Sequence, residues 1–370
     1  MSRYVFDIEC NGFLDTVTKL HSLVLLDADT QEMFSYHEDF SEGLGRLESA
    51  EEVIGHNIVS FDIPVLKKLY PDLHFSAKET DTLVLSRLLH SDLKAEDAPR
   101  LRTKQIEASN YGSHSLEAWG QRLGFHKMNY TGGWDQWSPT MQLYCEQDVR
   151  VTLALYKHLD PSKYSAVAIN LEHDMMELCA AIEREGWPFD VKAGLSLYSE
   201  LSGLREKLKT DLQNLFPPWQ VVDRVVTYKR DNKKKDIKAG DTVTHMKTVH
   251  FNPGSRQHIA HCLTSKYNWS PKEFTESGQP KIDDEVLGNL VYPEAKKMAE
   301  FFLIQKIIAY LAEGDNAWLK MERQGRIHAR YNPNGTVTGR STHSAPNIAQ
   351  VPGVKKEKGK GILYGLEGGY

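Results

Sequence analysis

Acidic side chains stand at three separated places in the first part of the chain, and their spacing could build one reaction centre. Asp7 and Glu9 are two residues apart in an apolar run, so on a strand both side chains point to the same face. Asp62 ends the string NIVSFD. Tyr144 and Asp148 are four residues apart, which places them on one face of a helix. Together these positions offer carboxylates and one phenol.

Clustered carboxylates with a phenol are the groups that phosphodiester hydrolysis needs. The attacking water and the leaving 3′-oxygen both carry charge in the transition state, and two divalent ions about 3.5–4 Å apart can stabilise both. Mg²⁺ and Mn²⁺ are hard ions that prefer oxygen ligands. Packed acids would otherwise repel one another and shift their pKa values, so the cluster is expected to hold metal. Each motif alone could be surface charge, whereas the ordered set favours a metal-dependent nuclease.

The elements that must position these residues read as an α/β domain. Short apolar runs predict three strands, at residues 4–9, 21–27 and 53–56. Apolar residues at helical spacing predict four helices, at 63–69, 82–89, 115–123 and 139–158. The first strand would carry the first acid pair, and the last helix the phenol and the last acid. Strands followed by helices around them predict an α/β fold.

Beyond residues 160–163 the pattern changes. Long helical patterns cover 167–185 and 195–215. Residues 222–250 then form a β-like or loop segment rich in Lys and Arg, which either contacts DNA without reading its sequence or is a solvated lysine loop. Helices are expected to return after residue 252.

Bulk composition fits an ordinary globular protein without naming a partner. The formal net charge of -5 does not itself indicate a nucleic-acid binder. The 4 cysteines form no CxxC pair, so neither a zinc site nor a disulfide framework is expected, and a reducing cytoplasm fits. The chain shows no signal peptide at its start, and its apolar stretches are too short to span a bilayer, so no membrane association is expected.

The order DxE, NxxxFD and YxxxD resembles the tyrosine-bearing branch of the DEDD exonuclease superfamily. The resemblance implies a ribonuclease H-like fold, a mixed five-stranded sheet flanked by helices, and 3′→5′ exonuclease activity with two Mg²⁺ ions, or Mn²⁺. By that resemblance Asp7 would bridge the ions, and Glu9 and Asp148 would complete the tighter site, Glu9 also helping to hold the water. Asp62 would hold the second ion, and Tyr144 would position the attacking water.

Two further strings, DTLVLSRL at 81–88 and GSHSLEAWG at 112–120, resemble the family A DNA polymerases of short-tailed phages. In that group an apolar residue at the position of Phe13 wedges beside the terminal base, although Phe13 could equally be a packing residue. Asn57 would either touch substrate or only shape its turn. The resemblance makes the exonuclease a proofreading one, in the cytoplasm of an infected host cell.

The second half of the chain resembles the thumb and the start of the palm of the same polymerases. In the thumb-like part, Ser255 and Arg256 stand at a helix start and could hold phosphate. The string RIHARYNPNGTVTGRSTHSAPNIAQVP at 326–352 resembles the DNA-contacting start of the palm. By that resemblance the residues along the primer duplex, with Arg340 reaching the minor groove, would be Thr338, Arg340, Asn347 and Gln350.

The basic segment at 222–250 lies where the phage enzymes carry an insertion that recruits thioredoxin. Here the insertion is much shorter and differs in sequence, so thioredoxin binding is not expected. The aspartates that hold metal for synthesis follow the PNxxQxP string in family A polymerases, and no match to them is found here. We therefore expect a chain that degrades DNA and does not extend it, either one half of a split polymerase with a separate C-terminal partner or a shortened chain.

The resulting interpretation assigns an exonuclease domain to 1–165, a helical thumb with the basic insertion to 166–322, and a truncated palm start to 323–370. Its substrates would be single-stranded 3′ ends and primer-template DNA. Alternatives remain open: an exonuclease that trims RNA, a DNA-binding subunit without activity, or an exonuclease that is active only with its C-terminal partner.

Overall fold

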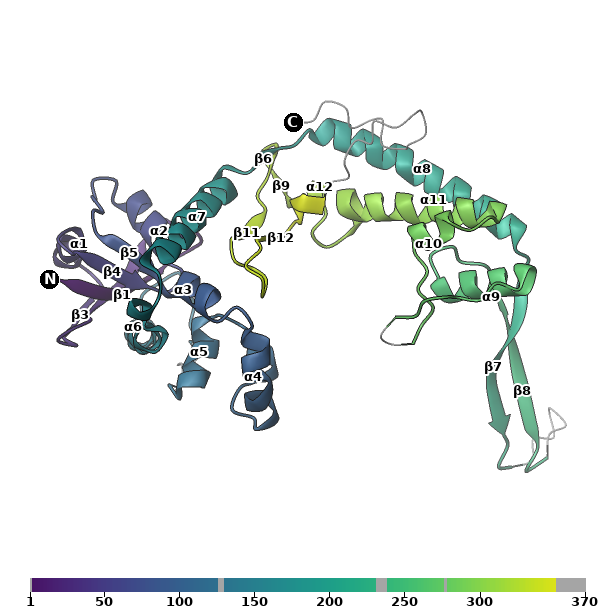
Figure 1. The fold of residues 1–370 in the computed structure, drawn as a ribbon, viewed down its shortest axis with the longest axis horizontal. Coiled ribbons are helices and arrows are strands. Elements are labelled where there is room, and N and C mark those ends of the chain that lie inside the picture. Colours follow the sequence, from purple (N-terminus) through teal and green to yellow (C-terminus); the bar gives the residue numbers. More distant parts are fainter. Residues whose placement is uncertain (1, 126–129, 231–237, 276–277, 351–370) are drawn as a thin grey trace. The chain divides into compact units, whose positions relative to one another are not determined.

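A computed structural model describes residues 2–125, 130–230, 238–275 and 278–350 (Figure 1). By internal contacts the chain forms two compact units: the first is Met1–Trp187 with His328–Val351, and the second is built on Pro188–Ile327. Helix α7 (Ala166–Glu185) packs with the first unit. The assignment of three domains by family resemblance groups the same helix with a thumb, and that assignment stays a prediction.

A five-stranded mixed sheet forms the centre of the first unit (Figure 1). Its order is β3 (Met33–Tyr36), β2 (Leu20–Asp27), β1 (Arg3–Cys10), β4 (Glu52–Gly55) and β5 (Lys78–Asp81). Strand β1 pairs antiparallel with β2 and parallel with β4, and β4 pairs parallel with β5. The three strands predicted from apolar runs are confirmed, and they are the central ones.

The two faces of the sheet bury different cores. Phe6 and Ile8 of β1 point into the core that contains Ile63 and Leu66 of α2 (Asp62–Leu69). Val5 points to the opposite face, where it packs with residues of α6 (Pro139–Leu159). Because side chains alternate along a strand, the residues two and four positions after Val5 also face α6. Those residues are the acid pair of the opening motif.

The helices predicted from periodicity are confirmed in the first unit, and short elements join them. Confirmed helices are α2, α3 (Thr82–Leu89), α5 (Leu116–Leu123), α6 and α7. Elements without a sequence prediction are β3, β5, α1 (Ser41–Glu48), α4 (Leu93–Arg102), η1 (Ala108–Asn110) and η2 (Pro161–Lys163). Strand β5 reads KETD, which is polar and short, so no apolar run marks it.

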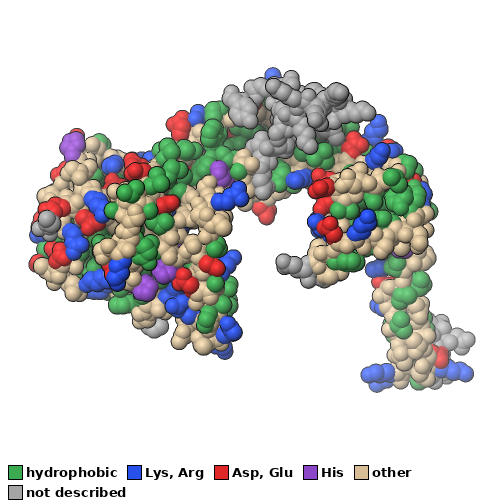
Figure 2. Space-filling model, viewed as in Figure 1, with side chains coloured by type: hydrophobic (Ala, Val, Ile, Leu, Met, Phe, Trp, Pro, Cys, Tyr) green, Lys and Arg blue, Asp and Glu red, His purple; other side chains and the backbone are tan. Residues whose placement is uncertain are grey.

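Helix α7 is apolar on two opposite faces. Its inner face includes Ile169 and Met176, which are buried. Its outer face carries exposed apolar residues at positions i, i+4, i+8 and i+11, namely Val167, Leu171, Met175 and Leu178. Hydrophobic side chains gather along α7 in the space-filling view (Figure 2). We call these four residues the α7 stripe.

A small hairpin from the C-terminal part of the chain packs on α7 in the same unit. Strands β11 (Arg330–Asn332) and β12 (Thr342–Ser344) pair antiparallel, and η4 covers Ile348–Gln350. The Glu183 carboxylate accepts a hydrogen bond from the Tyr331 backbone N–H, and Trp187 Nε1 donates to the Tyr331 hydroxyl. These contacts attach the hairpin to the end of α7.

The second unit is mainly helical. Its core lies between α8 (Val191–Leu215), α9 (Arg256–Tyr267), α10 (Asp284–Gly288) and α11 (Pro293–Ile308). The basic segment forms an antiparallel hairpin of β7 (Trp219–Thr227) and β8 (Thr242–Val249), which is one of the two alternatives that its pattern left open. Residues 231–237 of the basic run lie outside the described part. The remaining elements are η3 (Ala309–Glu313), α12 (Trp318–Met321), and the two-residue strands β6 (Trp187–Pro188), β9 (Glu322–Arg323) and β10 (Arg326–Ile327). Among the described residues, none of the helices has the length and apolar character needed to span a bilayer.

Candidate active site

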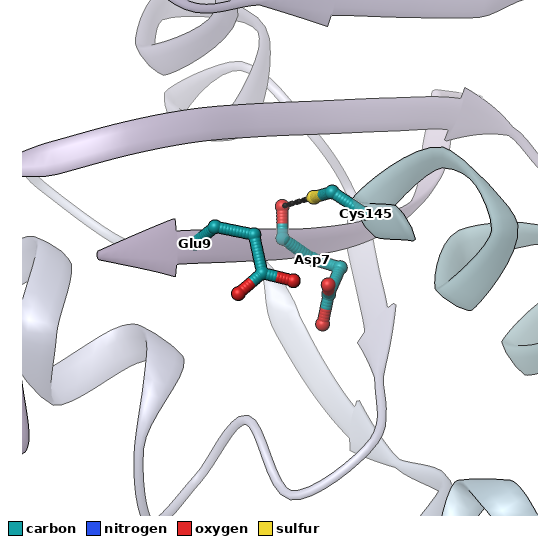
Figure 3. Close-up of side chains that lie close together, drawn as sticks. All are labelled: Asp7, Glu9 and Cys145. Atoms are coloured by element: carbon teal, nitrogen blue, oxygen red, sulfur yellow. Dashed lines mark hydrogen bonds between the residues drawn. The ribbon is translucent and has the colours of Figure 1, made fainter. Parts of the chain in front are cut away.

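The first acid pair lies on the face of β1 that α6 covers. A carboxylate oxygen of Asp7, one of Glu9 and the Sγ of Cys145 all lie within 4.8 Å of one another (Figure 3). Cys145 comes from α6, and its Sγ donates a hydrogen bond to the Asp7 backbone oxygen at 3.4 Å. This contact fixes the first turns of α6 against the centre of β1.

The two other acids of the motif set face the same region. Asp62 is buried in the first turn of α2, and Asp148 is buried on α6, one turn after Tyr144. The charge of Asp148 contributes to raising the pKa of Asp62, and the charges of Asp7, Glu9 and Asp148 contribute to raising the pKa of Cys145. Electrostatic coupling of this kind falls off steeply with distance. The four predicted carboxylates, from β1, α2 and α6, are thus close enough for their charges to act on one another or on the same thiol, and Asp7 and Glu9 are the pair whose oxygens lie within 4.8 Å.

The Asp62 carboxyl group has a perturbed proton affinity. Burial raises its pKa to about 7, and the neighbouring charges of Asp81 and Asp148 act in the same direction. The backbone N–H groups of Asp62 itself and of Ile8 oppose the rise. A buried acid that holds its proton near neutrality is a group that a divalent cation would deprotonate. The donor set, oxygens of several buried acids, fits a hard ion such as Mg²⁺ or Mn²⁺.

Cys145 lies among the acids but does not fit as a ligand. Burial raises the pKa of its thiol well above the usual value, and the charges of Asp7 and Glu9 raise it further. Only a thiolate binds metal well, and thiolates suit soft ions rather than Mg²⁺. The proximity of Sγ to the carboxylates is thus a packing contact of α6 on β1.

We expect Cys145→Ala to keep hydrolytic activity within about threefold of wild type, because hard ions do not use a thiol ligand. The buried side chain leaves only a small cavity, so the free energy of unfolding should fall by about 1–2 kcal/mol. Rates with Mg²⁺ and a denaturation curve measure both quantities. A loss comparable to that of an acid variant would show that the thiol takes part in metal binding.

The strand-to-helix turn that carries Asp62 is held by an acid that sequence reasoning missed. Asp81 ends β5 and accepts backbone hydrogen bonds at three points: Asn57 N–H at 2.8 Å, Val59 N–H at 3.2 Å and Leu83 N–H at 2.8 Å. Asn57 has a φ of 70°, a left-handed conformation that Asn tolerates better than most residues. Asn57 thus shapes this turn, one of its two predicted roles. The available signal for Asp81 was its place as N-cap of α3.

Asp81→Asn is expected to lower the free energy of unfolding by about 1–3 kcal/mol, because the new amide NH₂ would face the Val59 N–H and leave it without an acceptor. Chemical denaturation in chelator measures the change. Asp92→Asn is the matched control: Asp92 caps α4 through Ala95 N–H, and Asn caps a helix about as well as Asp. Equal effects of the two variants would mean that Asp81 is an ordinary cap.

Tyr144 stands on α6 at the edge of the acid cluster, within an aromatic group. Its ring centroid lies 5.8 Å from that of Tyr130 and 6.3 Å from that of Trp134. Phe13 lies in the loop between β1 and β2 and is 79% exposed, so it is not a core residue. Its backbone oxygen accepts from the N–H groups of Thr16 and Val17, which fixes the turn that presents the ring.

The other predicted DNA-contact residues lie on other elements. Ser255 caps α9 through the His258 N–H at 3.3 Å, and Arg256 Nε donates to the Ile282 oxygen at 2.9 Å. Both line an open pocket of about 580 Å³ in the second unit, together with residues 275, 279 and 302. The Ser255 side chain occupies one backbone N–H at the start of α9. The pocket beside it is open space next to the helix start.

The palm-like string lies in the first unit from His328 onward, and its last two residues, 351 and 352, are outside the described part. Thr338 and Arg340 are exposed in the loop between β11 and β12, and the Arg340 N–H donates to Thr336 Oγ1 at 2.9 Å. The Asn347 side chain accepts from the Ala349 N–H at 3.1 Å. The side chain of Gln350 lies outside the described part.

Comparisons with known proteins find similarity to DNA polymerases. A family model described as DNA polymerase family A matches residues 224–364. A solved structure, the POL domain of Pol1 from M. smegmatis in complex with DNA primer-template and dNTP, aligns with a TM-score of 0.63 over 95% of this chain and 53% of that chain. At 14% identity this likeness shows the fold alone.

Sequence comparison finds similar proteins among phage enzymes. The DNA-directed DNA polymerases of Escherichia phage T7 and Enterobacteria phage T3 are each 35% identical to this chain over 96% of its length. DNA polymerase I of Caldicellulosiruptor bescii is 26% identical over 40% of the chain. The chain is therefore similar to phage DNA polymerases over nearly its whole length, and part of it matches the family A model, as its motifs predicted. It spans 64% of the length of the two phage relatives.

Proposed function

We propose that residues 1–165, which lie in the first unit, form a metal-dependent 3′→5′ exodeoxyribonuclease that proofreads for a family A DNA polymerase. The observation that carries the proposal is the cluster of four carboxylates that β1, α2 and α6 bring together beside the central strand of a mixed sheet. The strand order and the helices on both faces support a ribonuclease H-like domain within 1–165. The thumb role of 166–322 and the palm role of 323–370 belong to the same proposal.

Each side chain of the cluster has a proposed role in hydrolysis. Asp7, Glu9, Asp62 and Asp148 would hold two Mg²⁺ ions, which when bound stabilise the charge on the attacking and leaving oxygens. The Tyr144 hydroxyl would donate a hydrogen bond to the attacking water, or accept one from it, and so orient the water. Glu9 would help to hold the same water. Asp62 gives up its proton before it can serve as a ligand, which ties activity to pH.

DNA is the proposed substrate, in the form of single-stranded or frayed 3′ ends, with release of nucleoside 5′-monophosphates. The two phage relatives are DNA-directed DNA polymerases, which favours DNA over RNA. Exposed cationic residues outside the acid cluster, such as Arg340, suit contacts with a phosphate backbone.

The test uses the purified chain with Mg²⁺ and single-stranded DNA labelled at the 5′ end, resolved as a ladder. Stepwise shortening that chelator abolishes supports the proposal, and a 3′-labelled strand should lose its label at once. An RNA strand of the same sequence separates the DNA enzyme from an RNA-trimming one. Absence of shortening with both Mg²⁺ and Mn²⁺ would contradict an autonomous exonuclease.

A second candidate role, a DNA-binding subunit that needs a C-terminal polymerase half, has one observation in its favour. The α7 stripe is exposed and runs from the first turn of α7 to Leu178, five residues before Glu183, which holds the β11–β12 hairpin. Its proposed occupant is a polypeptide with the polymerase region that the phage relatives carry and this chain does not span. Exposed apolar stripes of this kind mark protein contacts.

Pull-down of that polypeptide by the purified chain tests the role. Leu171→Lys with Leu178→Lys should abolish capture while leaving the exonuclease ladder unchanged. Capture that the double variant does not weaken would place the contact elsewhere. Self-association of the wild type that the double variant removes would mean that a second copy covers the stripe.

A further inference from the structure

The segment between α5 and α6 places two aromatic side chains beside Tyr144. Ring centroids of Tyr130 and Trp134 are 4.8 Å apart at an interplanar angle of 63°. Trp134 meets Tyr144 at 78° with centroids 6.3 Å apart, and Tyr130 meets it at 5.8 Å. We call Tyr130, Trp134 and Tyr144 the aromatic bracket. The bracket joins a loop residue with no assigned role to the phenol of the candidate site.

Backbone contacts hold the Trp134 end of the bracket in place. The Trp134 carbonyl oxygen accepts a hydrogen bond from Nε2 of His21, a fully buried residue of β2, at 3.0 Å. Burial lowers the pKa of His21, so the ring is a neutral donor at neutral pH. The Tyr130 hydroxyl donates to the Gly133 oxygen at 2.7 Å. The loop is therefore positioned without help from the Trp134 indole.

A second tryptophan in the same segment does a different job. Trp137 Nε1 donates to Gln142 Oε1 at 3.0 Å, and its ring stacks on His37 with centroids 4.3 Å apart. Trp137 thus fastens the segment to α6 and to residues after β3. Trp134 is 43% exposed and contacts its neighbours at steep angles rather than in a stack. Much of the indole surface remains available beside the candidate site.

We propose that Trp134 is a base-stacking subsite, which takes an unpaired nucleobase at the 3′ end of a DNA strand and thereby delivers the adjoining phosphate to Tyr144 and the acids. The proposal rests on the exonuclease function proposed above. Every base has a flat π-face, so stacking on an indole binds single strands without reading their sequence. A paired 3′-terminal base is held in the duplex by its partner and by the base below it, so the subsite would favour frayed ends over paired ones.

The experiment compares DNA affinities of Trp134 variants for two strands. All chains carry Asp7→Asn, so that the DNA stays intact. A short 5′-fluorescein oligo(dT) is titrated with Mg²⁺ present, beside the same strand with abasic 3′-terminal nucleotides. Trp134→Ala should weaken binding of the intact strand by about 10-fold, within the range measured for base–aromatic stacking. The abasic strand should bind equally well to chains with and without the Trp134→Ala substitution. Trp134→Phe should retain most of the affinity for the intact strand.

Active chains give a second readout. With Asp7 in place, Trp134→Ala should raise KM for single-stranded DNA about 10-fold and change kcat much less. Trp137→Phe is the matched control within the segment, because Phe keeps a ring beside His37 and the contact of His21 with the Trp134 carbonyl stays, so KM should change much less than in Trp134→Ala. Intrinsic tryptophan fluorescence should be quenched on binding, and less so in Trp134→Phe.

An equal loss of affinity for intact and abasic strands would overturn the subsite, because the indole would then not stack on a base. A fall in kcat with unchanged KM would assign the bracket to holding Tyr144 alone. Both outcomes presuppose a wild-type ladder. Absence of that ladder would instead remove the exonuclease proposal itself, so the two failures are distinguishable.

Discussion

Asp7→Asn is expected to lower the rate of 3′→5′ hydrolysis by about 10³-fold or more, since removal of one preorganised electrostatic contact already costs about 10²–10³-fold. Asp7 occupies the centre of the acid cluster, on the middle strand of the sheet and next to Glu9. The substitution keeps the shape of the side chain but removes one ligand charge. Ladder assays under single-turnover conditions measure the loss.

The matched control is Asp39→Asn, because Asp39 is an exposed acid before α1, outside the cluster. It should trim DNA at the wild-type rate. Both variants should melt within a few degrees of wild type in chelator. An Asp7→Asn chain that trims within about tenfold of wild type would be inconsistent with a cluster whose bound ions supply several kcal/mol of transition-state stabilisation.

Asp62→Asn should stabilise the metal-free protein at high pH while abolishing activity. Burial raises the folded-state pKa of Asp62 to about 7, above its unfolded value. A carboxyl group shifted in this direction contributes stability that is fully present below the unfolded pKa and is lost as pH rises through about 7. Asn has no proton to lose, so the advantage of the variant over wild type should grow by about 2–3 kcal/mol between pH 5 and pH 8.

Denaturant unfolding of both chains in chelator, at pH 5 and at pH 8, measures this difference. Mg²⁺ at pH 8 should stabilise wild type and leave Asp62→Asn almost unchanged, since ion binding is coupled to loss of the Asp62 proton. Parallel stability curves for the two chains across this range would show that Asp62 is not held in a desolvated, acid-rich site.

The positions of most candidate site residues were predictable because they lie in elements with a clear period. Asp7 and Glu9 sit in an apolar strand, and Tyr144 and Asp148 share a face of the longest helix in the first unit. A period of two or of 3.6 fixes which side chains share a face, whatever the surroundings. The meeting of these faces then follows from burial of the apolar residues between them.

The roles of Asp81 and Trp134 were not predictable, because neither residue lies in an element with a clear apolar period. Asp81 acts through three backbone N–H groups from two different elements, and the polar strand that ends in Asp81 has no apolar run. Trp134 lies in a segment without regular structure, and its partner His21 is more than a hundred positions away in the chain. Contacts between irregular segments depend on tertiary packing, which sequence periodicity does not encode.

The predicted DNA-contact residues are a third case. Their roles come from the family resemblance, and the structure shows only their surroundings. Ser255 is a helix cap beside a pocket in one unit, and Thr338 and Arg340 lie in a hairpin loop of the other. Each position is compatible with phosphate contact. Their roles in primer-template binding stay predictions that footprinting on DNA would examine.

The most direct measurement of the central claim is anomalous diffraction from crystals of the full chain grown with Mn²⁺ and a short single-stranded DNA. Two manganese peaks are expected among the carboxylates of Asp7, Glu9, Asp62 and Asp148, with the 3′-terminal phosphodiester beside them and the Tyr144 hydroxyl near the scissile bond. Manganese bound elsewhere with DNA present, or an acid cluster that stays protonated and free of metal at pH 8, would contradict it.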